Sequence, residues 1–420
     1  MQNTDALRIA VVGGGAAGLM AAGFAEQCGA RVTVFEPNAK LGRKLSITGK
    51  GRCNLTNDCT TEEFFPNVTR NPRFLFASLA AFSPADTKDF FEELGVPLKT
   101  ERGRRVFPQS DRAADIVDAL ARHIDGCGVV HEKVKSLKAE NGRIVGLSTQ
   151  SGEYAFDAVI LATGGASYPL TGSDGSGYRL ATELGHTVTP LSPSLVPLTS
   201  NDSVCPALMG LSLRNVGLRI LKNTGGKPIY EDMGEMLFTH FGVSGPMVLS
   251  ASAHLHEMDL TALTLEIDLK PALDEKTLDK RLCADLEKYH NRDFVHAIAD
   301  LLPSKMIEPF VERIGVDPRK KAHSVTKEER RRLLDGLKHF RIPLSGFRPI
   351  AEAIVTSGGI EVREVNPKTM MSRLVRGLFF AGEILDLDAY TGGYNLQIAF
   401  STGRAAGIAA AQYEITEETV

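Results

Sequence analysis

Near the N-terminus, an apolar stretch runs straight into glycines, and this feature constrains the chain more than any other. The segment from Leu7 to Val12 has the character of a strand buried on both faces of a parallel sheet. Gly13, Gly15 and Gly18 follow with GxGxxG spacing. In this motif the first glycine permits a tight turn, the second lets backbone N–H groups approach a pyrophosphate, and the third lets the helix pack on the strand. The pattern therefore predicts an α/β nucleotide-binding fold.

The residues after the turn limit which nucleotide can bind. A helix is expected to run to about Gly29, and the segment 31–36 supplies a second strand that ends in Glu36. A carboxylate at this position can accept hydrogen bonds from a ribose diol. It would repel a 2′-phosphate, so we expect a Rossmann-like unit that holds FAD or NAD.

The next part of the chain favours FAD over NAD. A helix near 112–124 and a strand at 128–134 lead into a predicted three-stranded meander, in which Asn141-Gly142 is a type I′ hairpin signal. The segment 157–165, DAVILATGG, then returns as a buried strand that ends in glycines. This layout resembles the two-dinucleotide-fold flavoproteins of the glutathione reductase superfamily, and the resemblance implies FAD.

A second strand, glycine-rich loop and helix occupy residues 377–403. FAD is long, so the N-terminal turn can hold its ADP half while this passage approaches the ribityl chain and the flavin. In the resemblance, Gly382 and Glu383 stand where the superfamily usually has Gly-Asp, whose carboxylate bonds the ribityl or phosphate region. Gly393 and a helix that begins near Asn395 would direct N–H groups at the flavin N1/O2 edge.

Three longer stretches carry a closer resemblance. They are KLGRKLSITGKGRCNLTN at 40–57, GEMLFTHFGVSGPMVL at 234–249, and the segment 366–403 that contains the C-terminal glycines. Together they resemble the aminoacetone oxidase-like bacterial FAD flavoproteins, a family that also includes a reductase of the bile-acid pathway and many members of unknown activity. The resemblance covers nearly the whole chain and implies bound FAD, an FAD domain made from both chain ends, and an inserted barrel-and-helix domain. It leaves the substrate open.

The segment 40–57 concentrates cations among glycines. Arg43, Lys44 and Arg52 suit a diphosphate or an anionic flavin edge, and a solvated basic loop is the alternative. Cys53 and Cys59 are separated by five residues, whereas the redox pair of disulfide reductases has four between its members. We therefore favour packed or flavin-adjacent thiols over a redox pair.

The residues expected to bind FAD come from the segments described above. They are Gly13, Gly15, Ala16, Ala17, Gly18, Glu36, Pro37, Arg43, Lys44, Gly51, Arg52, Cys53, Asn54, Val134, Ala162, Thr163, Gly164, Gly382, Glu383, Gly393, Tyr394, Asn395 and Leu396. Arg52 is also a candidate catalytic residue.

Prolines near 190–197 and the segment 342–349 mark an insertion, because both flanks belong to one FAD site. We expect an FAD-binding domain formed by residues 1–190 and 346–420, with a substrate or cap domain over 191–345. The insertion reads as β-barrel-like over 191–272 and helical over 273–345. Within the helical part, Thr326 and Glu329 have capping-box spacing.

His240 is the residue of the insertion that best fits a catalytic role. A histidine can exchange a proton near neutral pH, so His240 is a candidate catalytic acid or base. The alternative is a structural histidine beside two phenylalanines. The remaining histidines have no ligand spacing, so no metal site is expected.

Charge and composition limit the partners. The formal net charge is −3, which gives no overall attraction to nucleic acid or anionic lipid. The basic run at 317–332 is interrupted by glutamates and lacks interleaved aromatic residues, so it reads as a solvated helix face. No apolar run approaches a membrane span, no signal peptide is recognised, and the six cysteines show no CxxC. We expect a cytoplasmic protein with a small-molecule substrate and no nucleic-acid or membrane partner, and the oligomeric state stays open.

The sequence thus predicts an FAD-dependent oxidoreductase that passes hydride between a small organic substrate and flavin. Only one complete GxGxxG exists, so an amine oxidase that uses dioxygen is the leading hypothesis. A transiently docked NAD(P)H would instead give a reductase of a conjugated double bond. A flavoprotein that acts with RNA is a third, less favoured alternative.

Overall fold

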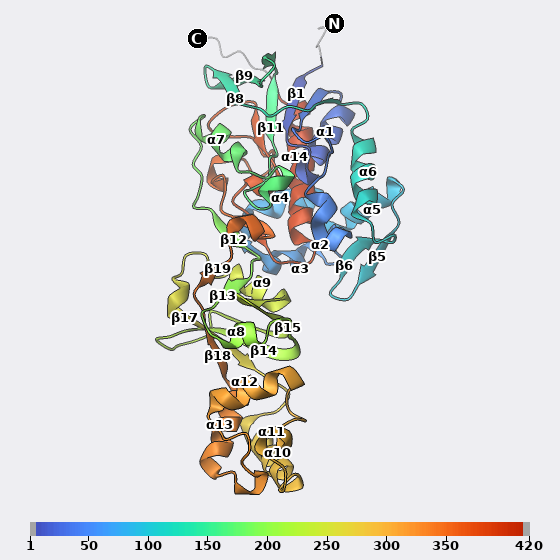
Figure 1. Ribbon diagram of the computed structural model, residues 1–420. Helices are drawn as coiled ribbons and strands as arrows, with labels where there is room; N and C mark the ends of the chain where they lie inside the picture. The colour runs from blue at the N-terminus through green and yellow to red at the C-terminus, as the bar shows by residue number, and fades with distance from the viewer. Residues whose placement is uncertain (1–5, 415–420) are drawn as a thin grey trace. The chain divides into compact units, whose positions relative to one another are not determined.

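The computed structural model describes residues 6–414 of the protein (Figure 1). The contacts within the chain divide it into two compact units, Met1–Ser194 with Pro349–Val420 and Leu195–Arg348. Each unit has its own cluster of buried apolar side chains. We propose that these units are the FAD-binding domain and the inserted cap domain expected from the sequence.

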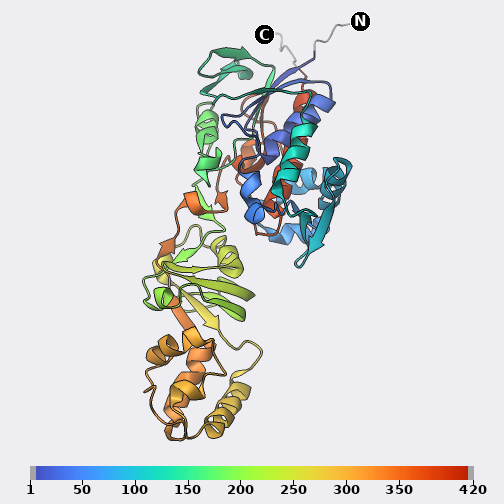
Figure 2. The same cartoon turned by 45° about the vertical axis from the view of Figure 1, so that its right-hand side comes forward.

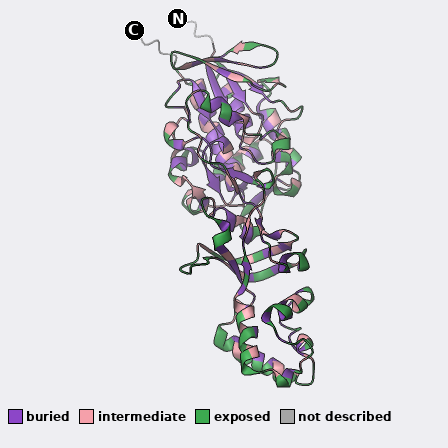
Figure 3. Ribbon diagram, turned by 60° about the vertical axis from the view of Figure 1, so that its left-hand side comes forward, coloured by how far each residue is buried: buried purple, intermediate pink, exposed green. Residues whose placement is uncertain are grey.

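A parallel sheet forms the core of the first unit, and both ends of the chain contribute to it. In the described residues its strand order is β21-β11-β1-β2-β7, and every pairing is parallel. The strands are β1 Arg8–Val12, β2 Arg31–Phe35, β7 Gly128–Val130, β11 Ala158–Leu161 and β21 Leu378–Phe380. Every residue of β11 and β21 is buried, as expected for strands covered on both faces, and Figure 3 shows that buried residues are concentrated in the interior of this unit. The Rossmann-like fold built from both chain ends is therefore confirmed.

Helices of the first unit surround this sheet. The longer ones are α1 Ala16–Gln27, α4 Phe76–Ala81, α5 Pro84–Glu93, α6 Ala113–His123, α7 Ser176–Thr182 and α14 Tyr394–Ala411. Helix α1 ends as expected before Gly29, which has a φ of 90°.

Helices α1 and α14 lie side by side although almost the whole chain separates them (Figures 1 and 2). A Cβ at Gly403 would lie 2.4 Å from the backbone oxygen of Ala17, and a Cβ at Gly407 would lie 2.2 Å from that of Ala21. Glycine at both positions therefore permits the close approach. Because both contacts advance by one helical turn in the same direction, the two helices run parallel and their N-termini point the same way.

The predicted meander is present, with β8 Ser136–Glu140, β9 Arg143–Ser148 and β10 Glu153–Ala155. Asn141 and Gly142 have φ of 50° and 72°, the positive values that a type I′ turn needs, so this hairpin is confirmed. The strand expected at 128–134 is shorter, because the chain leaves the sheet at His131. The ring Nδ1 of His131 is 2.8 Å from the backbone oxygen of Asn38.

Smaller strand groups complete the first unit. A three-stranded sheet consists of β3 Thr56–Asn57, β5 Leu98–Glu101 and β6 Arg105–Pro108. Two antiparallel pairs join distant segments, β4 Val68–Arg70 with β22 Asp388–Ala389, and β12 Ser192–Ser194 with β20 Val355–Ser357.

The second unit is an antiparallel sheet with helices. In the described residues the strand order is β18-β17-β14-β15-β16-β13-β19. The strands are β13 Leu198–Thr199, β14 Ser212–Lys222, β15 Tyr230–Thr239, β16 Gly242–Ser244, β17 Leu263–Asp268, β18 Phe340–Pro343 and β19 Gly346–Phe347.

The helices of this unit are α8 Val204–Ala207, α9 Pro246–Ser252, α10 Glu275–Lys288, α11 Phe294–Ala297, α12 Ser304–Ile314 and α13 Lys327–Lys338. Thr326 caps α13 in the predicted capping box with Glu329, which is confirmed. No helix within residues 6–414 is both long and apolar enough to cross a membrane.

Candidate functional site

The turn between β1 and α1 has the geometry that the GxGxxG spacing predicts. Gly13 has a φ of 111°, and a Cβ there would lie 2.4 Å from the backbone oxygen of Ala162. A Cβ at Gly18 would lie 1.8 Å from the oxygen of Gly13, so the helix packs directly on the turn. A Cβ at Gly15, by contrast, would have no atom of the described residues within 4 Å apart from Gly15 itself and its two chain neighbours. The backbone at Gly15 is therefore open to a phosphate.

Two helix N-termini are available to an anion. The first intrahelical bonds are Leu19 N to Gly15 O at 2.9 Å in α1 and Gln397 N to Gly393 O at 3.0 Å in α14. Neither helix has a side-chain cap or an acidic residue in its first turn. The N–H groups ahead of these bonds lack intrahelical partners and can donate to a ligand.

The spacing of these two N-termini suits a long cofactor. Ala17 lies beside Gly403, so the start of α1 is level with about residue 402. Helix α14 begins at Tyr394, about eight residues or roughly 12 Å earlier along the parallel axes. A ligand that is anionic at two separated places, such as a diphosphate joined to a reducible flavin, matches this arrangement.

The two predicted carboxylates lie within this region, and both already accept hydrogen bonds from the protein. Glu36 is 9% exposed and accepts a bond from Gly14 N at 2.9 Å. Glu383 accepts bonds from Lys44 Nζ at 2.6 Å, Ser167 Oγ at 3.0 Å and Thr356 N at 2.9 Å. Glu383 thus joins the basic loop at 40–57 to the C-terminal passage, two segments far apart in sequence.

Buried polar atoms without a protein partner test whether a polar cofactor fits. Thr163 Oγ1 and Asn54 Oδ1 are both buried without a hydrogen bond. Both residues belong to the predicted FAD-binding segments. Buried polar groups are normally hydrogen-bonded, so these two atoms, together with the open backbone at Gly15, fit a group such as FAD.

Comparison with known proteins identifies the family. Residues 7–409 match the family described as HI0933-like protein Rossmann domain. The chain belongs to the HI0933-like family. Membership makes it an FAD-dependent oxidoreductase with a Rossmann-like FAD-binding fold.

Two curated proteins are similar to this chain over nearly its whole length. The 3-dehydro-bile acid delta(4,6)-reductase of Clostridium scindens is 31% identical over 413 residues, which cover 96% of this chain and 99% of that protein. The ribosomal RNA dihydrouridine synthase of Haemophilus influenzae is 31% identical over 407 residues, which cover 95% and 97%. Among solved structures, 3-ketosteroid delta1-dehydrogenase from Sterolibacterium denitrificans has a TM-score of 0.52 at 13% identity, over 98% of this chain and 100% of that chain. That similarity is one of fold alone.

In this HI0933-like chain, Arg52 is held by the β5–β6 hairpin. Its guanidinium pairs with Glu101 and with Asp111 at 2.5 Å, and it lies 4.1 Å from the centre of the Phe107 ring. Hydrogen bonds to Glu101 and Asp111 raise the pKa of Arg52. Both carboxylates would have to share Arg52 with any cofactor or substrate. Its expected catalytic role stays a prediction.

The cysteines of the same loop are packed thiols. Cys53 is fully buried, and burial raises the pKa of its thiol to about 12. Burial also raises the pKa of Cys59 to about 11. Both are free cysteines, and neither has the lowered pKa that thiolate chemistry requires.

The residues at the start of α14 divide into packing and ligand-facing groups. A Cβ at Gly393 would lie 2.3 Å from the backbone of Thr56, and the Tyr394 ring packs on Phe64 at 5.1 Å. Burial raises the pKa of Tyr394 to about 12. The Asn395 amide is bonded to the backbone of Ala389 at 2.7 and 3.1 Å. The backbone N–H groups at the start of α14, rather than these side chains, are therefore the groups without a partner inside the helix, and their binding to FAD stays a prediction.

Every predicted FAD-binding residue lies in the first unit, whereas His240 lies in the second. His240 is exposed in the turn between β15 and β16, and its ring contacts Phe241 at a centroid distance of 4.9 Å. The contacts within the second unit assign it no catalytic task, so a role as acid or base stays a prediction.

Several residues that organise the site were not predicted. Asn38 binds Glu36, while Ser167 and Thr356 bind Glu383. Asn38 could have been suspected from its position two residues after the acidic strand end. Thr356 had no local signal, because its contact with Glu383 exists only in the folded chain.

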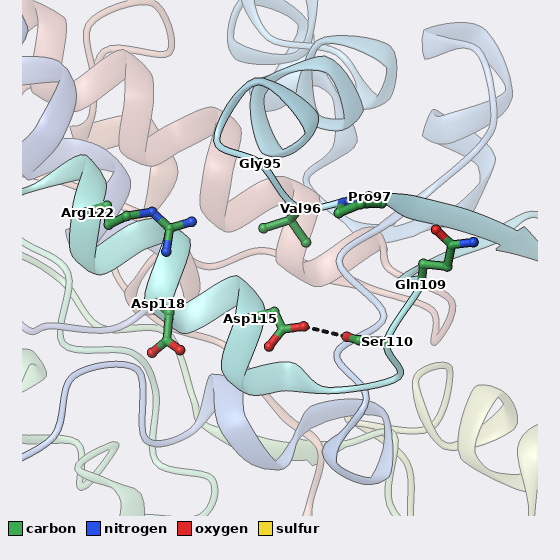
Figure 4. A pocket seen from close by; sticks show the side chains of 8 residues that line it. All are labelled: Gly95, Val96, Pro97, Gln109, Ser110, Asp115, Asp118 and Arg122. Atoms are coloured by element: carbon green, nitrogen blue, oxygen red, sulfur yellow. Dashed lines mark hydrogen bonds between the residues drawn. The ribbon is translucent and has the colours of Figure 1, made fainter.

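A cavity of about 440 Å³ lies elsewhere in the first unit (Figure 4). It is lined by Gly95, Val96, Pro97, Gln109, Ser110, Asp115, Asp118 and Arg122. Ser110 Oγ donates to Asp115 at 2.5 Å, and Arg122 donates to the backbone oxygen of Leu94 at 2.8 Å. No predicted site residue lines this cavity.

Metal ligands do not cluster among residues 6–414, where no group of three or more His, Cys, Asp or Glu side chains could hold a metal ion.

Proposed function

We propose that this chain is an FAD-dependent reductase of a carbon–carbon double bond conjugated with a carbonyl group. The observation that carries the proposal is that two relatives, each 31% identical over at least 95% of the chain, are named for reductions of this kind. A 3-dehydro-delta(4,6) steroid has its double bonds conjugated with the C3 carbonyl. Dihydrouridine is uridine with the double bond next to its C4 carbonyl reduced.

The open glycine turn and the uncapped start of α14 in the first unit support the part that FAD would play in such a reduction. When bound, reduced FAD supplies the hydride for the carbon beta to the carbonyl, and a proton completes the alpha carbon. The uncapped N–H groups of α14 would stabilise negative charge at the flavin N1/O2 edge. NAD(P)H would dock transiently as electron donor, because FAD would occupy the single GxGxxG of the chain.

A small organic molecule is the substrate class we propose. Several cations of the basic run at 317–332 are engaged within the protein, which weakens the RNA alternative. Lys320 pairs with Glu329 at 2.8 Å, Arg330 pairs with Asp279 at 2.8 Å, and Arg332 donates to backbone oxygens of Ile314 and Gly315. These cations are therefore not fully available to phosphates.

Amine oxidation with dioxygen is the second candidate. It is supported by the resemblance of the long motifs to aminoacetone oxidase-like proteins and by the missing second dinucleotide motif in the sequence. An oxidase needs no NAD(P)H, and this difference separates the two candidates.

Anaerobic flavin spectroscopy tests the proposal. NADH or NADPH should bleach the bound flavin. A conjugated enone steroid that is then added without air should restore the flavin absorbance. In a parallel experiment, a uridine-containing ribosomal RNA fragment replaces the steroid. If the RNA restores the flavin absorbance and the steroid does not, the substrate is RNA rather than a small molecule. Bleaching by simple amines, with recovery in air but not with an enone or RNA, would favour the oxidase and contradict the reductase.

A further inference from the structure

The Glu36 carboxylate, the proposed partner of the adenosine ribose, has three donors from the protein itself. Oε2 accepts one hydrogen bond, from Gly14 N at 2.9 Å. Oε1 accepts two bonds, both from Asn38, with N at 2.9 Å and Nδ2 at 2.7 Å. The side-chain amide of Asn38 therefore occupies the acceptor that a ribose hydroxyl would use.

The orientation of the Asn38 amide is fixed by its neighbours. Its Nδ2 also donates to the backbone oxygen of Thr171 at 3.1 Å, so both partners of Nδ2 are acceptors. Its Oδ1 accepts a bond from Arg43 at 2.8 Å. Rotating the amide by half a turn would place an oxygen against two acceptors and a nitrogen against a guanidinium. Asn38 is thus held as a donor toward Glu36.

Counting acceptor sites shows the conflict with a cofactor. Each carboxylate oxygen accepts about two hydrogen bonds, so Oε1 of Glu36 is full while Oε2 has one site left. A ribose diol binds a carboxylate best with one hydroxyl on each oxygen. One hydroxyl can bind Oε2 directly, but the other can bind Oε1 only after Asn38 Nδ2 leaves.

We infer that Asn38 competes with the adenosine ribose of FAD for Glu36 and thereby limits the affinity of the chain for its cofactor. The inference rests on the proposal that FAD binds at this turn. It goes beyond the reductase proposal because it concerns cofactor retention, whatever the substrate.

Departure of the amide would also remove a contact with a neighbouring loop. Nδ2 of Asn38 holds Thr171, and a Cβ at Gly172 would lie 2.8 Å from Nδ2, so this backbone rests directly on the amide. The start of the same loop is held separately, because Ser167 is bonded to Lys44 at 2.7 Å and to Glu383. Ribose binding would therefore remove one contact of the loop at residue 171, while its start and its internal bonds, such as that of Thr171 N to Tyr168 O at 2.8 Å, remain.

The substitution Asn38→Leu tests this competition, because leucine has a similar volume but neither donates nor accepts. We expect the apoprotein variant to bind FAD about three- to tenfold more tightly than the unchanged apoprotein, in a titration followed by flavin fluorescence. Asn38→Ala should give the same direction without the leucine side chain. Asn223→Leu is the matched control, since Asn223 also donates to a backbone oxygen, that of Thr261, but lies in the second unit.

The outcomes separate this inference from its premise. Unchanged or weaker FAD binding in both Asn38 variants would overturn the competition, and weaker binding would make Asn38 a residue that positions Glu36. The variant Glu36→Gln should weaken FAD binding at least severalfold. If Glu36→Gln binds FAD normally, the placement of the ribose at this turn is itself wrong.

Discussion

At the scale of single residues, the three glycines of the N-terminal turn serve different purposes. Gly13 and Gly18 are needed by the fold, because a Cβ at either position would collide with backbone oxygens. Gly15 is surrounded by open space and has a φ of −90°, which any residue adopts. Its lack of a side chain suits the N-cap of α1 and also leaves room for a ligand.

This distinction gives a pair of matched variants. Gly15→Ala should lower the free energy of unfolding of the apoprotein by at most about 1 kcal/mol, the cost of alanine at an N-cap, since the methyl group meets no described atom beyond its chain neighbours. FAD affinity should fall by about tenfold or more, because the methyl group stands where the pyrophosphate approaches the backbone. Gly18→Ala should instead lower the free energy of unfolding by about 1–3 kcal/mol through overpacking.

Denaturant unfolding of the apoproteins and FAD titration measure the two effects separately. If Gly15→Ala bound FAD with unchanged affinity, the phosphate could not lie at this turn. Equal losses of stability in both variants would show that the open space at Gly15 is filled in solution.

At the scale of elements, His123 links two helices of the first unit. It ends α6, its ring lies 5.0 Å from the rings of Phe24 and Phe90, and a Cβ at Gly23 of α1 would lie about 2.1 Å from it. Burial is the main cause that lowers the pKa of His123 from 6.5 to about 4. The folded protein therefore holds this ring neutral where α1 and α6 meet.

The lowered pKa makes stability depend on pH. The unfolded chain takes up a proton near pH 6.5, while the folded chain does so only near pH 4, so stability falls as the pH drops through this window. At pH 5 the loss should be about 2 kcal/mol relative to pH 7.5. His123→Leu, which has no proton to bind, should flatten this part of the profile in urea unfolding.

The exposed His323 provides the control for this experiment. His323→Leu should keep the same dependence of unfolding free energy on pH as the unchanged protein. A profile for His123→Leu that is as steep as that of the control would mean that other groups, such as buried carboxyls, cause the dependence.

At the scale of the whole molecule, the sequence predicts backbone motifs well and side-chain partners poorly. The packing of Gly18 on Gly13, the Asn141-Gly142 hairpin and the α13 capping box follow from contacts within a few residues, so local patterns encode them. The pairing of Lys44 with Glu383 spans 339 positions, and no local pattern reports it. Arg52 illustrates the same limit, because carboxylates from a distant hairpin and loop determine its partners.

The two units also differ in what they should do alone. Each has its own apolar core, and every predicted FAD-binding residue belongs to the first unit. Strands β12 and β20, which flank the insertion, pair within the first unit, with Ser194 opposite Val355. If residues 195–348 are removed, the new chain ends at 194 and 349 therefore lie at or near the paired strands β12 and β20.

Replacing residues 195–348 by a short glycine-serine linker should leave a folded protein that binds FAD but does not turn over substrate. FAD binding should persist because the turn at Gly15, Glu36 and the α14 N-terminus are all retained. Turnover should be lost because the removed unit is the proposed cap of the substrate site.

The fragment 195–348 alone is the control, and it should unfold cooperatively around its own core without binding FAD. Turnover by the shortened protein would show that the first unit contains the whole substrate site, and loss of FAD binding in a protein that still unfolds cooperatively would show that the second unit supplies cofactor contacts.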